Sequence, residues 1–342
     1  MSRALDPGIT SSISTETFQK IYADIVQALC QETGTLLEIE FLGKSHPLPP
    51  DSNVLVDENY IAVSKVKLVQ AFVVGRRILL RYLKDCPKEK ILELQNATAV
   101  ILLMDPEHLT AANTRKRLIQ LFQDGPEAEL KAALKKEFLF VDSYLTSRLH
   151  RHTKSPTLWS HRRWLLEVSA SLHLKHDILR DLEDVILVAA ERHPKNYYAW
   201  SHMRWLTHTC STESSSVNEL PQIITVVKNW CLRHPGDTSG FSFLLFGLSH
   251  SKFANLGDSD ISNTCSAVCT DVLRLAVSFK WTHESVWVFL RTAVAGYGTE
   301  ADRAMFYAAI EDISKASPEG HKVLTRARDW CMQYEQKSGL GP

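Results

Sequence analysis

The sequence predicts an all-α fold, a right-handed α-α superhelix built from about five tandem helical hairpins. The first observation is an internal repeat, since Trp-Ser-His-x-Arg-Trp begins at Trp159 and again at Trp200, 41 residues later. The second is the helical spacing of apolar residues before each copy. The third is the presence of polar segments between the predicted helices, most clearly residues 207–221, which are predicted to form a loop. A period of tens of residues is typical of a solenoid, in which each hairpin buries its apolar face on its neighbours.

Three weaker copies keep the shape of the motif. Ala112, Phe241 and Trp287 stand at the position of the first tryptophan, at spacings of 41 to 47 residues. Proline is well placed just before a helix, because it has no N–H that would be left unpaired there. Each motif is therefore predicted to begin a helix. Three of the copies open with a proline, at Pro106, Pro194 and Pro235.

The first ninety residues differ from the repeats. Residues 14–30 and 65–84 have helical periodicity. Residues 36–42 and 53–63 carry β-branched residues on either side of a Pro-Leu-Pro-Pro stretch, which predicts a small β-hairpin. Three regions follow: an N-terminal region at 1–90, the helical repeats at 91–300 and capping helices at 301–342.

Charge and composition limit the classes of function. Lys plus Arg and Asp plus Glu each number 39, so no overall positive charge points to nucleic acid or to an anionic membrane. The first residues lack the apolar core of a signal peptide, and no apolar run is long enough to cross a bilayer. Seven cysteines at unpaired spacings fit a reducing compartment. We therefore expect a cytoplasmic protein with no membrane span and no nucleic-acid partner.

The aromatic and arginine positions of the repeat are expected to be structural. A tryptophan at one fixed position buries a large rigid area against the next repeat. An arginine four residues later lies on the same helical face, where it can stack on the indole or donate to carbonyls of an adjacent helix. His161 and His202 read as buried structural histidines rather than acid-base groups. The structural set is Trp159, Arg163, Trp164, Trp200, Arg204, Trp205, Phe241, Trp287 and Arg291.

The third copy resembles the repeat of protein prenyltransferase α subunits. Residues 194–205 read Pro-Lys-Asn-Tyr-Tyr-Ala-Trp-Ser-His-Met-Arg-Trp, and the resemblance covers about residues 92–292. The Ser-Gly-Phe at residues 239–241 is more similar to the repeat-containing members of this family than to farnesyl or Rab-type α subunits. The resemblance implies a crescent of hairpins around a β subunit that holds the zinc and the isoprenoid. No Asp, Cys and His set in this sequence resembles a catalytic zinc site.

This resemblance also implies a function and a partner. The chain is expected to be a non-catalytic α-type subunit of a protein geranylgeranyltransferase. Its β subunit, of the Rab type, would bind zinc and geranylgeranyl diphosphate and transfer the lipid to C-terminal cysteines of target proteins, with no cofactor on this chain.

Family α subunits present a lysine of the second repeat and polar residues of the third to the diphosphate. A lysine beside this group neutralises charge that develops on it in the transition state. This chain departs from the family at Ser155 and Pro156, where Asn-Tyr is usual, and at Tyr198, where farnesyltransferase-type subunits have histidine. The matching positions, and hence the diphosphate-facing candidates, are Lys154, Lys195, Asn196, Tyr197 and Tyr198.

Other interpretations are open. The missing tryptophan at Ala112, the missing arginine at Leu245 and the altered loop at residues 155–156 favour a helical-repeat scaffold for protein–protein interaction without a role in catalysis. A tetratricopeptide array is disfavoured because its period is about 34 residues. An independent enzyme is disfavoured because no nucleophile elbow, P-loop or dinucleotide fingerprint is present. Loss of Lys154 should slow a catalytic complex and leave a scaffold unaffected.

Overall fold

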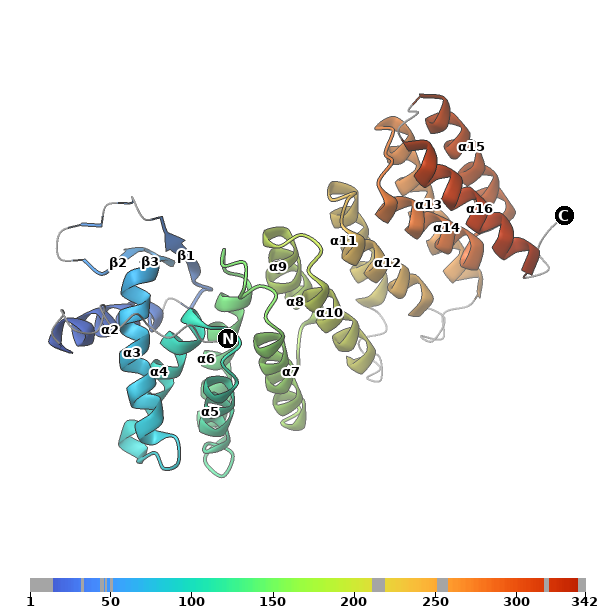
Figure 1. The fold of residues 1–342 in the computed structure, drawn as a ribbon. Helices are drawn as coiled ribbons and strands as arrows, with labels where there is room; N and C mark the ends of the chain where they lie inside the picture. The colour runs from blue at the N-terminus through green and yellow to red at the C-terminus, as the bar shows by residue number, and fades with distance from the viewer. Residues whose placement is uncertain are drawn as a thin grey trace. The chain divides into compact units, whose positions relative to one another are not determined.

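A computed structural model describes residues 15–31, 34–43, 46, 48–49, 52–210, 219–250, 258–316 and 320–337. These residues form helices and one small sheet (Figure 1). The predicted all-α helical-repeat fold with a small N-terminal sheet is confirmed. The chain forms two compact units. Unit 1 comprises Met1–His176 and Glu191–His193, and unit 2 comprises Asp177–Ala190 and Pro194–Pro342.

Unit 1 contains the sheet and the first helical hairpins. Its strands are β1 (Glu38–Leu42), β2 (Val54–Asp57) and β3 (Tyr60–Ser64). Its helices are α2 (Thr15–Leu29), α3 (Lys65–Tyr82), the short η1 (Lys88–Lys90), α4 (Ile91–Met104), α5 (Leu109–Gln120), α6 (Glu127–Leu145) and α7 (Pro156–Ser171).

Unit 2 begins with a helix that a π-turn interrupts, and the last two residues of that helix are counted in unit 1. Its parts are α8 (Ile178–Asp181), η2 (Leu182–Ile186) and α9 (Leu187–Arg192). The helices that follow are α10 (Tyr197–Cys210), α11 (Leu220–Arg233), α12 (Thr238–His250), α13 (Asp258–Ser278), α14 (Glu284–Tyr297), α15 (Glu300–Ala316) and α16 (His321–Lys337).

One predicted boundary is corrected. The loop predicted at residues 207–221 overlaps the last turn of α10, which continues to Cys210, and the first turn of α11, which begins at Leu220. Residues 211–218 lie outside the described residues. The polar composition of this segment matched a loop, but Thr207 and Thr209 donate to carbonyls four residues back, which is compatible with a helix.

The N-terminal sheet corrects the predicted pairing: the sequence predicted a hairpin of residues 36–42 with 53–63, whereas the hairpin lies within residues 54–64 and residues 38–42 add a parallel strand. β2 and β3 pair antiparallel, with Val54 opposite Val63 and a turn at Glu58, where φ is 51°. β1 pairs parallel with β3, with Ile39 opposite Ile61, so the strand order is β1-β3-β2. Ile39 and Val63 are fully buried. The sheet therefore belongs to the core of unit 1.

Every predicted repeat motif begins a helix. These helices are α5, α7, α10, α12 and α14, and each follows the other half of its hairpin. The pairs α4 with α5, α6 with α7, α11 with α12, and α13 with α14 pack together. After residue 300 the chain forms two helices, with α15 packed on α13 and α16 packed on α14.

Candidate functional site

The repeat helices share one capping arrangement at their N-termini. The residue four positions before the tryptophan position accepts a hydrogen bond from the backbone N–H three residues further on. This bond satisfies one of the N–H groups that a helix start leaves unpaired. His283, at this position in the fifth repeat, makes no such bond. The capping distances are 3.2 Å for Ala111 N to His108 Nδ1, 3.1 Å for Leu158 N to Ser155 Oγ, 3.2 Å for Ala199 N to Asn196 Oδ1 and 2.8 Å for Gly240 N to Asp237 Oδ1.

Lys154 lies in the turn immediately before Ser155, the N-cap of α7, and its side chain is exposed. The backbone around it is anchored, since Ser155 Oγ donates to the Pro106 carbonyl at 3.1 Å and Arg148 N donates to the Ile39 carbonyl at 3.1 Å. Within the described part of the chain, Lys154 forms no ion pair. It is therefore an exposed cation on a fixed backbone beside a helix N-terminus, where the helix dipole is positive.

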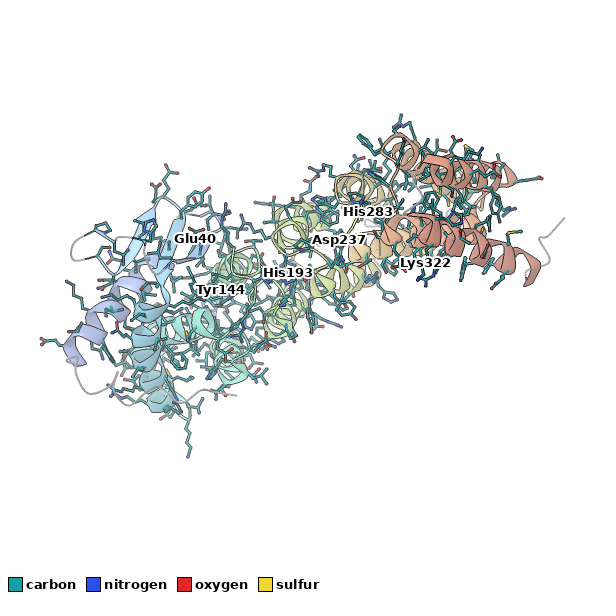
Figure 2. All side chains as sticks on the ribbon, turned by 45° about the horizontal axis from the view of Figure 1, so that its top comes forward. Glu40, Tyr144, His193, Asp237, His283 and Lys322 are labelled. Atoms are coloured by element: carbon teal, nitrogen blue, oxygen red, sulfur yellow. The ribbon has the colours of Figure 1, made fainter. Side chains whose placement is uncertain are left out.

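The loop before α10 holds the other four diphosphate-facing candidates, in unit 2. Lys195 is exposed and has a left-handed φ of 60°, and its backbone N–H donates to Asp237 Oδ2, which Figure 2 labels. Tyr197 and Tyr198 are exposed by 64% and 38%. Their rings pack edge to face, with centres 5.6 Å apart. Because both side chains are exposed, both phenols are accessible to a partner.

Asn196 differs from its neighbours because the fold uses its side chain. It is only 1% exposed, its Oδ1 caps α10, and its Nδ2 donates to the Ala189 carbonyl at 3.3 Å. Contact between this amide and a diphosphate requires the first turn of α10 to open. An N-cap position followed by a tryptophan four residues later is the sequence signal for this structural use.

The first aromatic position of the repeat is buried. Trp200 and Trp287 are fully buried, and Trp159 and Phe241 are nearly so. Two of the indoles also fix the turn that precedes their helix. The Nε1 of each donates to the carbonyl six residues earlier, at 2.9 Å from Trp159 to Thr153 and at 2.8 Å from Trp287 to Trp281. Trp164 and Trp205, five residues after the first tryptophan, are only partly buried.

The arginines four residues after the tryptophan make varied contacts. Arg163 is exposed and pairs with Glu167 at 3.1 Å along its own helix. Arg204 donates to Ser242 Oγ at 2.7 Å, and the guanidinium of Arg291 lies 4.8 Å from the centre of the Trp330 ring. The two arginines of unit 2 therefore connect one repeat helix to another helix.

Sequence reasoning missed a second, buried arginine position, three residues after the tryptophan position. Arg115 donates to both oxygens of Glu137 at 2.7 and 2.8 Å, and Arg162 donates to Asp142 at 2.7 Å. Both carboxylates come from α6, which packs against α5 and α7. The later repeats carry Met203, Leu244 and Leu290 at this position. The available signal was a basic residue in each of the first two copies whose neighbours on the same helical face, three and four positions away, are apolar.

His161 joins this buried network. Its Nε2 lies 2.8 Å from Glu137 Oε1. Burial raises the pKa of Glu137, but Arg115 and His161 outweigh it and hold that pKa at about 2. Burial lowers the pKa of His161, against the opposing pull of Glu137. The neutral ring therefore donates to a permanent carboxylate at pH 7. His202 is also buried and contacts Trp205 at 5.5 Å between ring centres.

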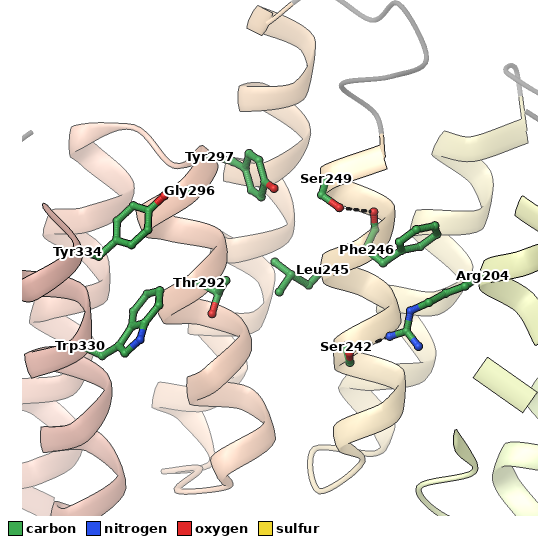
Figure 3. A pocket seen from close by; sticks show the side chains of 10 residues that line it. All are labelled: Arg204, Ser242, Leu245, Phe246, Ser249, Thr292, Gly296, Tyr297, Trp330 and Tyr334. Carbon is green, nitrogen blue, oxygen red and sulfur yellow. Dashed lines mark hydrogen bonds between the residues drawn. The ribbon is translucent and has the colours of Figure 1, made fainter. Parts of the chain in front are cut away.

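A cavity of about 510 Å³ lies among α10, α12, α14 and α16 in unit 2 (Figure 3). Leu245, where the repeat loses its arginine, lines it together with Arg204 and Thr292. On the opposite wall, Trp330 and Tyr334 stack at 5.4 Å. The position of the missing arginine thus contributes an apolar side chain to a cavity that is also lined by an arginine and a stacked aromatic pair.

The described residues include no group of three or more His, Cys, Asp and Glu side chains that is arranged to hold a metal ion. Their helices include none with the length and apolar character that a bilayer crossing requires.

Two family models match parts of the chain. The protein prenyltransferase alpha subunit repeat matches residues 135–168, which include most of α6 and α7 with the turn that carries Lys154. The ECM9 middle domain matches residues 158–271.

Three relatives are named for the same repeat. The chain is 32% identical over 120 residues to Protein prenyltransferase alpha subunit repeat-containing protein 1 of Danio rerio, covering 34% of this chain and 24% of the relative. It is 28% identical over 226 residues to each of the Xenopus laevis proteins 1-B and 1-A, covering 61% of this chain and 49% of each relative. The chain thus spans about a quarter to a half of the length of these relatives. The predicted resemblance is confirmed, since over part of its length this chain is similar to proteins that carry the prenyltransferase alpha subunit repeat.

Proposed function

We propose that this chain is the non-catalytic α-type subunit of a protein geranylgeranyltransferase. It supports a Rab-type β subunit, which holds zinc and geranylgeranyl diphosphate and transfers the lipid to C-terminal cysteines of target proteins. The tandem hairpins and the repeat match over α6 and α7 support this proposal. The observation that carries it is the exposed Lys154 beside the capped start of α7.

Lys154 would act by electrostatic stabilisation of the leaving diphosphate. A diphosphate leaving group gains negative charge as its bond to the isoprenoid carbon breaks. A cation placed against it therefore stabilises the transition state more than the ground state. The hydrogen bonds of this turn hold the backbone of the lysine in place, which limits the reorganisation of the backbone during the reaction. Lys195, Tyr197 and Tyr198 are exposed side chains of unit 2 and stay candidates for diphosphate contact.

The test is co-expression of the full chain with a Rab-type β subunit, followed by size exclusion and a geranylgeranyl transfer assay. We expect a stoichiometric complex that transfers lipid. In that complex, Lys154→Ala should lower kcat by about tenfold or more, because it removes charge stabilisation realised in the transition state. Lys175→Ala is the matched control, since Lys175 is also an exposed lysine of unit 1 and lies beyond the other end of α7.

The controls separate three results. Complex formation with loss of turnover only in Lys154→Ala supports the subunit and the role of this lysine. Complex formation and transfer with equal kcat in both variants removes the lysine from catalysis and favours the scaffold described below. Failure to bind any prenyltransferase β subunit contradicts the proposed function.

A second function is a helical-repeat scaffold that recruits a partner without supporting catalysis. The burial of Asn196 favours it, because a polar side chain expected at the diphosphate is used instead as a helix cap. A scaffold predicts a stable complex in which Lys154→Ala, Lys195→Ala and Tyr198→Phe all leave turnover unchanged.

A further inference from the structure

A cavity of about 530 Å³ lies within unit 1, next to the N-terminal sheet that is not part of the repeats. Its walls come from β1, the start of α3, the end of α4 and the loop of residues 146–155, which joins α6 to α7. Glu40, labelled in Figure 2, marks the β1 side. We call this space the sheet–loop cavity.

Hydrogen bonds hold the walls of the sheet–loop cavity together. Arg148 N donates to the Ile39 carbonyl at 3.1 Å, which ties the loop to β1. His152 is 2% exposed, and its Nε2 lies 3.0 Å from the Leu102 carbonyl, which ties the loop to α4. Burial lowers the pKa of His152 to about 4, so this ring is neutral at pH 7 and Nε2 is the donor. The cavity is thus a preformed feature of the fold.

The floor and the rim of the cavity differ in chemistry. Leu68 and Leu149 are buried on the floor, and Phe41 and Met104 are partly buried beside them. On the rim the exposed cations are Lys65, Arg148 and Arg151. Such a site suits an occupant with an apolar group flanked by negative charge.

The rim cations are available because their own partners hold them weakly. Arg148 lies 3.8 Å from Glu38, a partly buried side chain that pairs more closely with Arg192, and 4.0 Å from the exposed Glu40. Arg151 donates to Asp105 at 3.1 Å, and both of these side chains are exposed. Surface pairs of this kind contribute little, so an incoming carboxylate can replace them at small cost. The ammonium of Lys65 lies 5.6 Å from the centre of the Phe41 ring.

We propose that the sheet–loop cavity binds an acidic segment of a partner protein, with one apolar side chain on the floor and carboxylates against Lys65, Arg148 and Arg151. The cations come from two separate elements, α3 and the 146–155 loop, which fits carboxylates spaced along a peptide better than one compact anion. The proposal does not rest on the geranylgeranyltransferase function, because it uses none of the diphosphate-facing candidates.

The test is fluorescence anisotropy of the full chain with a labelled peptide, Gly-Asp-Glu-Leu-Glu-Asp-Gly, blocked at both ends. We expect it to bind at least about tenfold more tightly than the same peptide with Asn and Gln for the acids, or with Ser for the Leu. Affinity should fall as salt rises from about 50 to about 300 mM, since the charges are exposed. A neutral peptide ending in Leu with a free carboxylate distinguishes capture of a chain terminus from side-chain recognition.

Two variants locate the site. Lys65→Gln combined with Arg151→Gln should weaken the acidic peptide by about tenfold or more. Arg180→Gln should leave its affinity unchanged, since Arg180 is an exposed arginine on α8 in unit 2. Circular dichroism and Tm check that each variant is folded.

Three results overturn the proposal. One is equal affinity for the acidic and neutral peptides. Another is unchanged binding in the double variant. The third is displacement of the acidic peptide by inorganic phosphate at matched ionic strength, which would assign the cavity to a small anion.

Discussion

Asp237 shows how single residues hold the repeats in place. Its Oδ1 accepts hydrogen bonds from the backbone N–H of Ser239 and of Gly240, and its Oδ2 accepts from Lys195 N. One buried carboxylate thereby caps α12 and also fixes the loop before α10, where Lys195 has a left-handed φ. The exposed Tyr197 and Tyr198 follow directly on this loop, so their presentation depends on Asp237.

Replacement of Asp237 by Ala should lower the free energy of unfolding by about 2 kcal/mol or more, because it removes a cap and leaves further N–H groups unpaired. Urea unfolding measures this change. Asp237→Asn is the control and should lose less, since its amide oxygen can keep the bonds to Ser239 and Gly240. Equal losses for both variants would contradict the capping role.

Replacement of Gly240 by Ala should destabilise the protein, although Gly-to-Ala substitutions within a helix usually stabilise. A Cβ at this position would lie 2.6 Å from Trp230 Cζ3 and 3.2 Å from Cys231 Sγ. Gly240→Ala should therefore destabilise the protein by about 1 to 3 kcal/mol. Gly296→Ala in α14 is the matched control, because a Cβ there meets nothing within 4 Å. It should stabilise by about 0.5 to 1 kcal/mol, as Ala usually does in a helix. Thermal unfolding of both variants tests the contrast.

Between elements, the network of Arg115, Glu137 and His161 joins α5, α6 and α7. Each residue is at most 6% exposed, and the guanidinium also lies 3.5 Å from the centre of the Phe140 ring. A buried charge pair adds little over an apolar pair, but removal of one partner is costly because the other charge stays buried. The network therefore sets which faces of the three helices meet.

Glu137→Gln should lower the free energy of unfolding at pH 7 by about 3 to 5 kcal/mol, since Arg115 is then left without its counter-charge. The pKa of Glu137 is depressed in the fold to about 2, from 4.5. Its stabilising effect is therefore present above about pH 4.5 and is lost as the pH falls towards 2. Urea unfolding from pH 7 to pH 3 should show this loss in the parent protein and a flatter profile in the variant. Glu167→Gln, which removes the exposed pair with Arg163, should change little at any pH.

At the scale of the whole molecule, exposed aromatic residues affect the solubility and the thermal stability of the isolated chain. Tyr197 and Phe279 are 64% and 66% exposed. A partner that binds only the folded chain stabilises it by mass action, by about 2.7 kcal/mol when its concentration is 100-fold above Kd. We expect the isolated chain to self-associate at high concentration, and the β subunit to raise its Tm. Light scattering and differential scanning fluorimetry measure both effects. A lone chain that stays monomeric, with a Tm that the β subunit leaves unchanged, would contradict an obligate subunit.

The sequence by itself determined the repeat architecture. Tryptophan, proline and capping residues act within a few positions of one another, so Trp159 and Trp200 located the helix starts without knowledge of any neighbour. The sequence also located the β-forming segments of the N-terminal region, but it assigned residues 53–63 to one arm of a hairpin, whereas that segment itself forms the hairpin of β2 and β3.

Only the tertiary structure decided which polar residues are buried and what surrounds them. Arg115 and Arg162 are buried while Arg163 is exposed, because α6 supplies carboxylates to the first two from about 20 residues away. The parallel pairing of β1 and the sheet–loop cavity likewise depend on segments distant in sequence. A charged side chain is buried only where an oppositely charged group lies beside it. When that group comes from a distant segment, the local sequence does not predict the burial.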